Sequence, residues 1–143
     1  LDCGEDKPDD HREYFGLNDF TGLREGQAVF LSGELNSSEF KNANKRVLIH
    51  HIPLYGLREE AYNPSLEQWG DLLKDAPFNI AMNGHTHRFA YHPKDSLGNN
   101  FPVVVGGGKD PRSATMMILQ KEGDKMTLQV LDTKGEEMLK LDL

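Results

Sequence analysis

The spacing of apolar residues changes along the chain, and the change predicts two kinds of structure. Apolar side chains recur at helical spacing across residues 23–35 and again after Asn63, where Pro64 suits a first helical turn. Two short apolar runs, at 46–51 and 78–82, are typical of buried strands. Because the second helix lies between these two strands, the order favours a crossover that joins parallel neighbours.

Beyond residue 88 the apolar runs become shorter, and turn residues separate them. The runs cover residues 88–91, 101–105, 114–119, 125–131 and 138–141. Glu122-Gly123-Asp124 and Thr133-Lys134-Gly135 are typical hairpin turns between the last three. The second half is therefore expected to be an antiparallel meander attached to an α/β first half. The fold class is mixed α/β (α+β).

Composition and charge limit the classes of protein to which the chain can belong. The 143 residues suffice for one domain with a core, and no apolar run approaches the roughly 20 residues that span a bilayer. The formal net charge of −7 argues against binding to nucleic acid, whose phosphates such a surface repels. A small phosphate ester remains compatible, because bound metal ions reverse the local field. The single cysteine, Cys3, excludes a disulfide framework and a thiolate-rich zinc site within the chain.

Histidines are concentrated at the ends of two predicted strands. His50 and His51 end the first, and His85 and His87 follow the second. The carboxyl ends of strands in an open α/β sheet share one rim, where ligands gather. In extended backbone His85 and His87 would point to the same side, with Gly84 permitting the change of direction. His50 and His51 point to opposite faces, so we assign His51 to a metal site and His50 to the core or to a supporting role.

Other residues are given simpler interpretations. A lone strand-end histidine is more often structural than a ligand, which is how His50 is interpreted on its own. The three glycines at 106–108 fit a phosphate cradle or, as we prefer, a strand-end turn. Two histidines, His11 and His92, are expected to have no functional role. Three apolar residues are expected to lie in the core: Trp69, Met116 and Met117.

A resemblance to a known family covers nearly the whole chain. His51-Ile52-Pro53, followed by Asn83-Gly84-His85-Thr86-His87, resembles the last two signature blocks of the calcineurin-like metallophosphoesterases, the group that includes purple acid phosphatases. Leu1-Asp2-Cys3-Gly4-Glu5-Asp6-Lys7, the stretch 101–108 and the closing meander are similar to bacterial members, although only the histidine blocks are specific. The resemblance implies the C-terminal half of a four-layer α/β/β/α sandwich, with parallel strands first.

The resemblance also implies roles for individual residues. His51 and His85 would bind one metal ion and His87 the other, and His50 and Asn83 would support the ligands or contact the substrate. The family's other ligands belong to Asp-x-His, Gly-Asp-x-x-Asp and Gly-Asn-His-Asp/Glu blocks, and none of these occurs here. Residues 1–143 are therefore interpreted as the C-terminal part of one metallophosphoesterase domain, without its N-terminal half.

The implied activity is hydrolysis of phosphate mono- or diesters by water activated between two divalent metal ions, whether zinc, manganese or iron. No catalytic residue lies within the chain, so alone it should be inactive and bind at most a single metal ion weakly. Its expected partner is a small phosphate ester, and an open sheet edge would favour self-association. The resemblance is compatible with an exported or periplasmic protein, but the sequence leaves the localisation open.

Two alternatives remain at this stage. One is a non-catalytic α/β module in which the histidines hold a structural or single metal ion, or none. The other is a hydrolase with one metal ion whose remaining ligands come from Asp2, Asp6 or Asp9.

Overall fold

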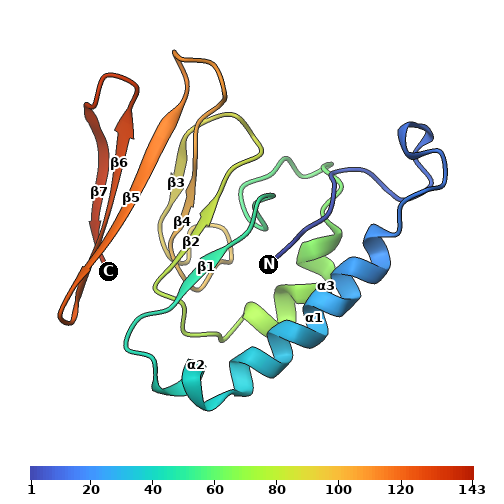
Figure 1. Ribbon diagram of the computed structural model, residues 1–143, viewed down its shortest axis with the longest axis horizontal. Coiled ribbons are helices and arrows are strands. Elements are labelled where there is room, and N and C mark those ends of the chain that lie inside the picture. Colours follow the sequence, from blue (N-terminus) through green and yellow to red (C-terminus); the bar gives the residue numbers. More distant parts are fainter.

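The computed structural model describes residues 1–143 and contains two β-sheets with helices on one side (Figure 1). Sheet A has the strand order β1-β2-β4-β3, and sheet B the order β5-β6-β7. The strands of sheet A are β1 (Val47–Ile49), β2 (Ile80–Asn83), β3 (Ala90–His92) and β4 (Val103–Val105). Those of sheet B are β5 (Thr115–Glu122), β6 (Lys125–Asp132) and β7 (Glu137–Asp142). The expected mixed α+β class is confirmed.

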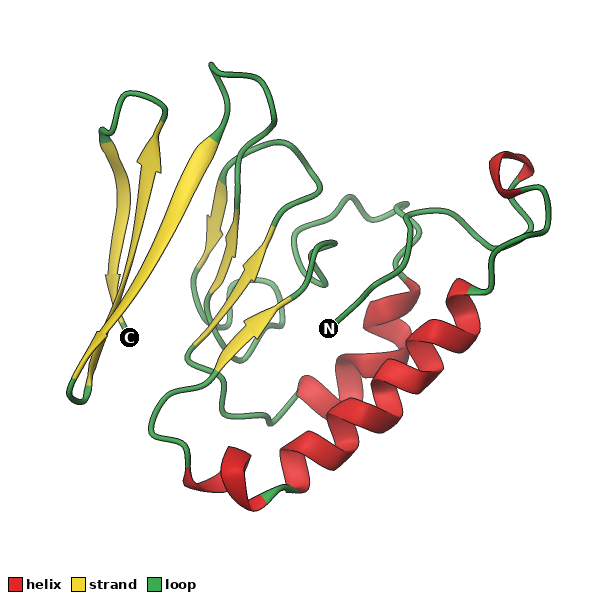
Figure 2. Ribbon diagram, in the orientation of Figure 1, coloured by secondary structure: helices red, strands yellow, loops and turns green.

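Three α-helices and a short 3-10 helix complete the fold (Figure 2). They are η1 (Arg12–Tyr14), α1 (Phe20–Asn36), α2 (Ser38–Asn42) and α3 (Pro64–Leu73). The side chain of Asp19 caps α1 by accepting from the backbone N–H of Gly22 at 2.9 Å. The side chain of Asn63 likewise caps α3, with Pro64 in the first turn as expected. The short α2 was not predicted. No helix combines the length and apolar character needed to cross a bilayer.

Sheet topology confirms one expectation and corrects another. Strands β1 and β2, which are connected through α3, are adjacent and parallel, as the strand-helix-strand order predicted. Strand β4, expected in the antiparallel meander, instead pairs in parallel with β2, and β3 pairs antiparallel with β4 inside sheet A. All three residues of β4 are buried, which suits a central strand covered on both faces. The meander is therefore confined to β5, β6 and β7.

Two apolar clusters lie on the two faces of sheet A. Val103 and Val105 pack toward the helices with Trp69, while Val104 points to the opposite face and packs with Leu128 of sheet B. Neighbouring residues of a strand serve opposite faces because side chains alternate along it. The helices, sheet A and sheet B therefore form three layers (Figure 1).

One region of the outer face of sheet B is polar. It presents Gln120, Glu122, Lys125, Thr127, Gln129, Lys140 and Asp142. Of the two methionines expected in the core, Met117 packs between the sheets, but Met116 is 60% exposed. Trp69 is fully buried, as predicted. A four-layer arrangement stays a prediction.

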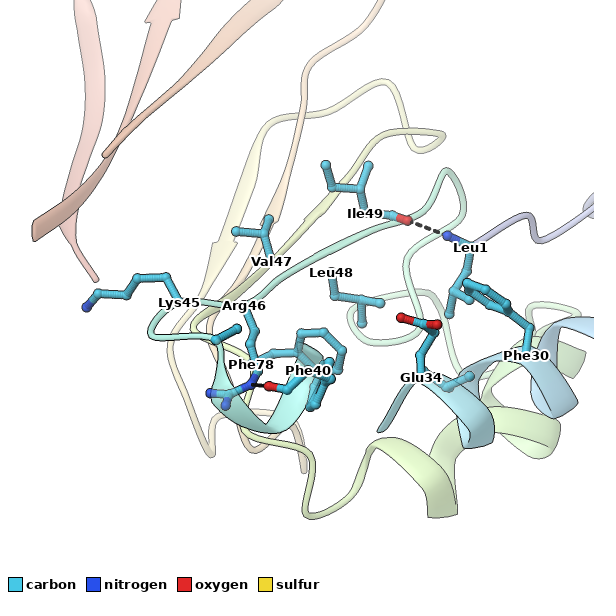
Figure 3. Close-up of a pocket in the computed structure, with 12 residues that line it drawn as sticks. Leu1, Phe30, Glu34, Phe40, Lys45, Arg46, Val47, Leu48, Ile49 and Phe78 are labelled. Atoms are coloured by element: carbon cyan, nitrogen blue, oxygen red, sulfur yellow. Dashed lines mark hydrogen bonds between the residues drawn. The ribbon is translucent and has the colours of Figure 1, made fainter. Parts of the chain in front are cut away.

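The edge of sheet A is open at β1. Strand β1 pairs with β2 on one side, and on the other the amino group of Leu1 donates to the carbonyl of Ile49 at 2.8 Å (Figure 3). Between this edge and α1 lies an apolar groove of about 400 Å³, lined in part by Phe30 and Val47. Ile49 is 62% exposed there, which leaves a large apolar side chain on an unprotected edge.

Candidate metal centre

The histidines predicted to bind metal come from the carboxyl ends of two paired strands. Beyond the last ladder pair of β1 and β2, the backbone N–H of Gly84 donates to the carbonyl of His51 at 2.9 Å. This hydrogen bond holds the two strand ends together after both strands have finished. The rings of His51 and His85 consequently lie edge to face, with centroids 5.3 Å apart and planes at 87°. The structure therefore brings together the two histidines that the resemblance assigns to one metal ion.

His50 and His51 point to opposite faces, as expected. His51 is exposed, whereas His50 is 4% exposed and lies edge to face with Trp69. The Nδ1 atom of His50 lies 2.8 Å from the carbonyl of Ile52, a distance that requires this nitrogen to carry the proton. Burial lowers the pKa of His50 to about 4, so the ring is neutral at physiological pH.

Asn83, the last residue of β2, hydrogen-bonds to the buried His50. Its Nδ2 donates to the carbonyl of His50 at 2.8 Å and lies 3.1 Å from Nε2 of the same ring. Asn83 is 4% exposed, and its Oδ1 has no partner in the structure. The pair thus forms a buried polar link directly beneath His51 and His85, which fits the supporting role expected of both residues.

The turn after β2 differs from the expectation of extended backbone. His85 and His87 have φ values of 69° and 56°, in the left-handed region, whereas Gly84 does not. The prediction that both imidazoles leave an extended strand on the same side is therefore wrong. Non-glycine residues enter this region at a cost of about 1–3 kcal/mol, and such strain is concentrated at functional sites. A side chain at Gly84 would meet only His51 at ordinary contact distance, 3.5 Å, so glycine is not required for the turn.

His87 lies apart from the other two candidates. It is exposed, and its Cβ packs against Gly108, where an added Cβ would approach within 3.2 Å. No three histidine, cysteine, aspartate or glutamate side chains converge in an arrangement that could hold a metal ion. The chain thus presents a pair of imidazoles and a separate third one. Two adjacent imidazoles can supply part of a site for a divalent ion, which needs further ligands to complete it.

Asp6 is the carboxylate nearest to these histidines. Its Oδ2 lies 3.5 Å from Nε2 of His85, and its Oδ1 lies 3.1 Å from the ammonium of Lys7. Partial burial alone would raise the pKa of Asp6, but the hydrogen bond and charge of Lys7, helped by His85, hold it below its usual value. The other two aspartates considered as ligands are engaged elsewhere, since Asp2 accepts from Gly4 and Asp9 accepts from the first residues of α1.

A buried arginine holds the segment that carries Asp6. Arg24 is fully buried in α1, and its guanidinium donates to the carbonyls of Cys3 and Glu5 at 2.9 and 2.8 Å. Its Nη1 has no partner, and its charge lies 5.6 Å from the ring centroid of Tyr62. Burial raises the pKa of the Cys3 thiol, which therefore remains protonated and is a poor metal ligand.

The three glycines after β4 form a structural turn rather than a phosphate cradle. The N–H of Gly106 donates to Asn83, that of Gly107 to the hydroxyl of Thr115, and that of Gly108 to Ser113. Their amides are therefore occupied and not directed at a ligand. Glycine is needed at position 107, because an added Cβ would lie 1.9 Å from the carbonyl oxygen of Ser113.

A cleft of about 710 Å³ opens beside His85. Its wall includes Asp6, Arg58, Arg88 and His92. His92, expected to have no functional role, packs against Gly56. A Cβ added at Gly56 would lie 2.4 Å from Nε2 of His92. From the sequence, Asp6 was one of three aspartates considered as further ligands, and no sequence feature distinguished it from Asp2 and Asp9.

No family model and no curated protein sequence matches the chain. The family resemblance therefore depends on the histidine blocks, and any function inferred from it is a proposal.

Proposed function

We propose that the chain is the histidine-bearing half of a metal-dependent phosphoesterase that hydrolyses phosphate mono- or diesters. The observation that carries the proposal is the pairing of His51 with His85, whose ring centroids lie 5.3 Å apart beyond two adjacent parallel strands. Imidazoles at a shared strand rim suit divalent zinc, manganese or iron. Bound divalent ions would supply Lewis-acid stabilisation of the phosphate and a water of lowered pKa.

The chain's own residues have separable tasks in this proposal. His51 and His85 serve as neutral imidazole ligands for one ion and His87 for the other. Asp6, whose Oδ2 lies 3.5 Å from Nε2 of His85, is the carboxylate placed to orient that ring. The buried link between His50 and Asn83 keeps the two strand ends in register beneath the ligands.

Calorimetric titration of the chain with Zn²⁺ and Mn²⁺ tests the assignment. We expect weak binding of one ion, and a loss of affinity of more than about tenfold in His51→Asn and His85→Asn. His11→Asn is the matched control, because the His11 side chain caps η1 by accepting from the backbone N–H of Glu13 and belongs to neither strand end. Unchanged affinity in both site variants would refute the metal assignment.

Catalysis has its own test. The chain lacks the carboxylate blocks of the family, so we expect negligible hydrolysis of p-nitrophenyl phosphate by the chain alone. Turnover by residues 1–143 at the rate of a longer form of the protein would contradict this expectation. Coding sequence upstream of Leu1 that contains Asp-x-His, Gly-Asp-x-x-Asp and Gly-Asn-His-Asp/Glu in that order would support the two-metal mechanism.

The position of Asp6 favours one alternative strongly enough to be tested, a hydrolase with a single metal ion. If Asp6 were itself a ligand, Asp6→Asn would abolish binding of Zn²⁺ as completely as His51→Asn does. If Asp6 only orients His85, the variant should retain measurable binding, weakened by about tenfold. Isothermal calorimetry of the two variants side by side distinguishes these roles.

We also propose that the open edge of sheet A mediates self-association. Strand β1 has no strand partner on its outer side, where the carbonyl of Ile49 accepts from Leu1, and such an edge with the exposed Ile49 can pair with another strand. Sedimentation velocity across a range of concentrations should show dimers that Ile49→Lys removes. Met138→Lys, at an exposed methionine of sheet B, should leave the distribution unchanged. A monomer at every concentration would contradict the proposal.

A further inference from the structure

The cleft beside His85 combines charged and apolar walls. One wall comes from the loop after β1, including Leu57 and Arg58, and the other from the segment Arg88–Phe89 that leads into β3. Its volume of about 710 Å³ is large enough for a small organic molecule. Because His85 lines the same cleft, a ligand seated there would lie next to the candidate metal centre.

Two guanidinium groups in this cleft lack acidic partners. Every ion pair of the structure within 4.0 Å involves Lys7, His85 or Arg112, so Arg58 and Arg88 have no carboxylate partner. The one carboxylate in the wall, Asp6, is already paired with Lys7 and His85. In a chain of net charge −7 the cleft is therefore a local region of positive charge.

We propose that this cleft binds a second phosphate group of the substrate. The inference depends on the proposed function for the identity of the first phosphate, the one placed at the histidines. Guanidinium groups bind phosphate oxygens in pairs of parallel hydrogen bonds, which makes two free arginines a suitable receptor. The apolar side chains of Leu57 and Phe89 contact the carbon skeleton between the two groups. The substrate class is thus a small organic bisphosphate.

Phosphate binding without metal ions tests the cleft directly. The probe is inorganic phosphate, added to the isotopically labelled chain in the presence of a chelator at about pH 8, and the readout is amide and arginine Nε–H chemical shifts. We expect concentration-dependent shifts around Arg58 and Arg88. Arg58→Gln and Arg88→Gln should each weaken binding by about fivefold, the upper range for an exposed charge pair. Arg112→Gln, which removes an arginine paired with Asp110 at 3.1 Å, should have no effect.

The outcomes separate this inference from the proposed function. Shifts centred on the cleft together with loss of binding in both arginine variants support phosphate binding by the cleft, even if zinc does not bind and the phosphoesterase proposal fails. Shifts scattered over surface lysines, or equal binding in all three arginine variants, would overturn it while leaving metal binding intact. Malonate is the second probe, and malonate binding tighter than phosphate binding would overturn the assignment to a phosphate group.

Discussion

Acidification should destabilise the fold through His50, whose imidazole is buried beneath the candidate metal centre. Burial lowers its pKa from an ordinary value of 6.5 to about 4, while the carbonyl of Ile52 opposes the shift. An unfolded chain would hold a proton on this imidazole at pH values at which the folded chain does not. At these pH values folding requires the imidazole to release its proton. Acid therefore favours the unfolded chain.

The direction and the size follow from this difference in proton binding. Because the folded pKa lies below the unfolded one, stability is fully present above pH 6.5 and is lost as the pH falls from 6.5 to about 4. The gap of about 2.5 pH units, at about 1.4 kcal/mol for each, corresponds to about 3.5 kcal/mol of unfolding free energy. By about pH 5, where most carboxyl groups still carry charge, about 2 kcal/mol should already be lost.

Urea unfolding followed by circular dichroism measures the effect. The free energy of unfolding is determined at about pH 7.5 and about pH 5 for the wild type and for His50→Gln, with a chelator present to remove metal binding. Other groups titrate in both proteins, so the difference between the two pH dependences isolates His50. We expect the wild type to lose about 2 kcal/mol more than the variant over this range.

Equal losses in the two proteins would refute the reasoning. A second measurement covers the case in which His50→Gln does not fold, namely the pH titration of the His50 ring resonance in the folded wild type. That resonance should remain in its neutral position at pH 5.5 and below, as expected from a pKa of about 4. A midpoint near 6.5 would show that burial does not hold this imidazole neutral.

Three further predictions concern the supports of the site. Gly107→Ala should lower the unfolding free energy by about 1–3 kcal/mol, because the new methyl group would lie 1.9 Å from the carbonyl oxygen of Ser113. Thermal unfolding measures this loss, and Gly26→Ala, in open space on α1, is the control expected to stabilise slightly. Arg24→Met should cost about 2 kcal/mol in urea unfolding, because it removes two charge-assisted hydrogen bonds to the amino-terminal segment. Equal stability of this variant and the wild type would show that the bonds contribute nothing net. Asn83→Ala should weaken zinc binding by about tenfold in calorimetry, and unchanged affinity would remove its supporting role.

Much of the fold was predictable because the spacing of apolar residues distinguishes helices from strands. The runs at 46–51 and 78–82 are largely apolar, which predicts strands, and the helix between them indicates a parallel pair, although β1 lies at the sheet edge with Ile49 exposed. The last three strands could be assigned because glycine turns separate alternating segments. The placement of β4 failed for a physical reason. Three consecutive valines fit either a central parallel strand or part of a meander, and only long-range packing decides between them.

The proximity of His51 and His85 was predictable from the sequence, whereas the local geometry was not, and metal binding by these residues stays a prediction. The strand-end histidines identified the rim, since parallel strands present their carboxyl ends together. Nothing in the sequence reveals that His85 and His87 adopt left-handed backbone, because this conformation is imposed by the surrounding chain. The approach of Asp6 to His85 was equally hidden, since it depends on a buried arginine of α1 that holds a distant loop.

The distance along the chain between His51 and His85 has a kinetic consequence. The two rings meet only after α3 has docked and β1 has paired with β2, contacts between residues far apart in sequence that form slowly. A metal ion added to the unfolded chain therefore finds no preformed pair of ligands and cannot act as a nucleus for folding. It should slow unfolding while leaving the refolding rate unchanged, so that metal ions prolong the life of the native state rather than hasten its formation.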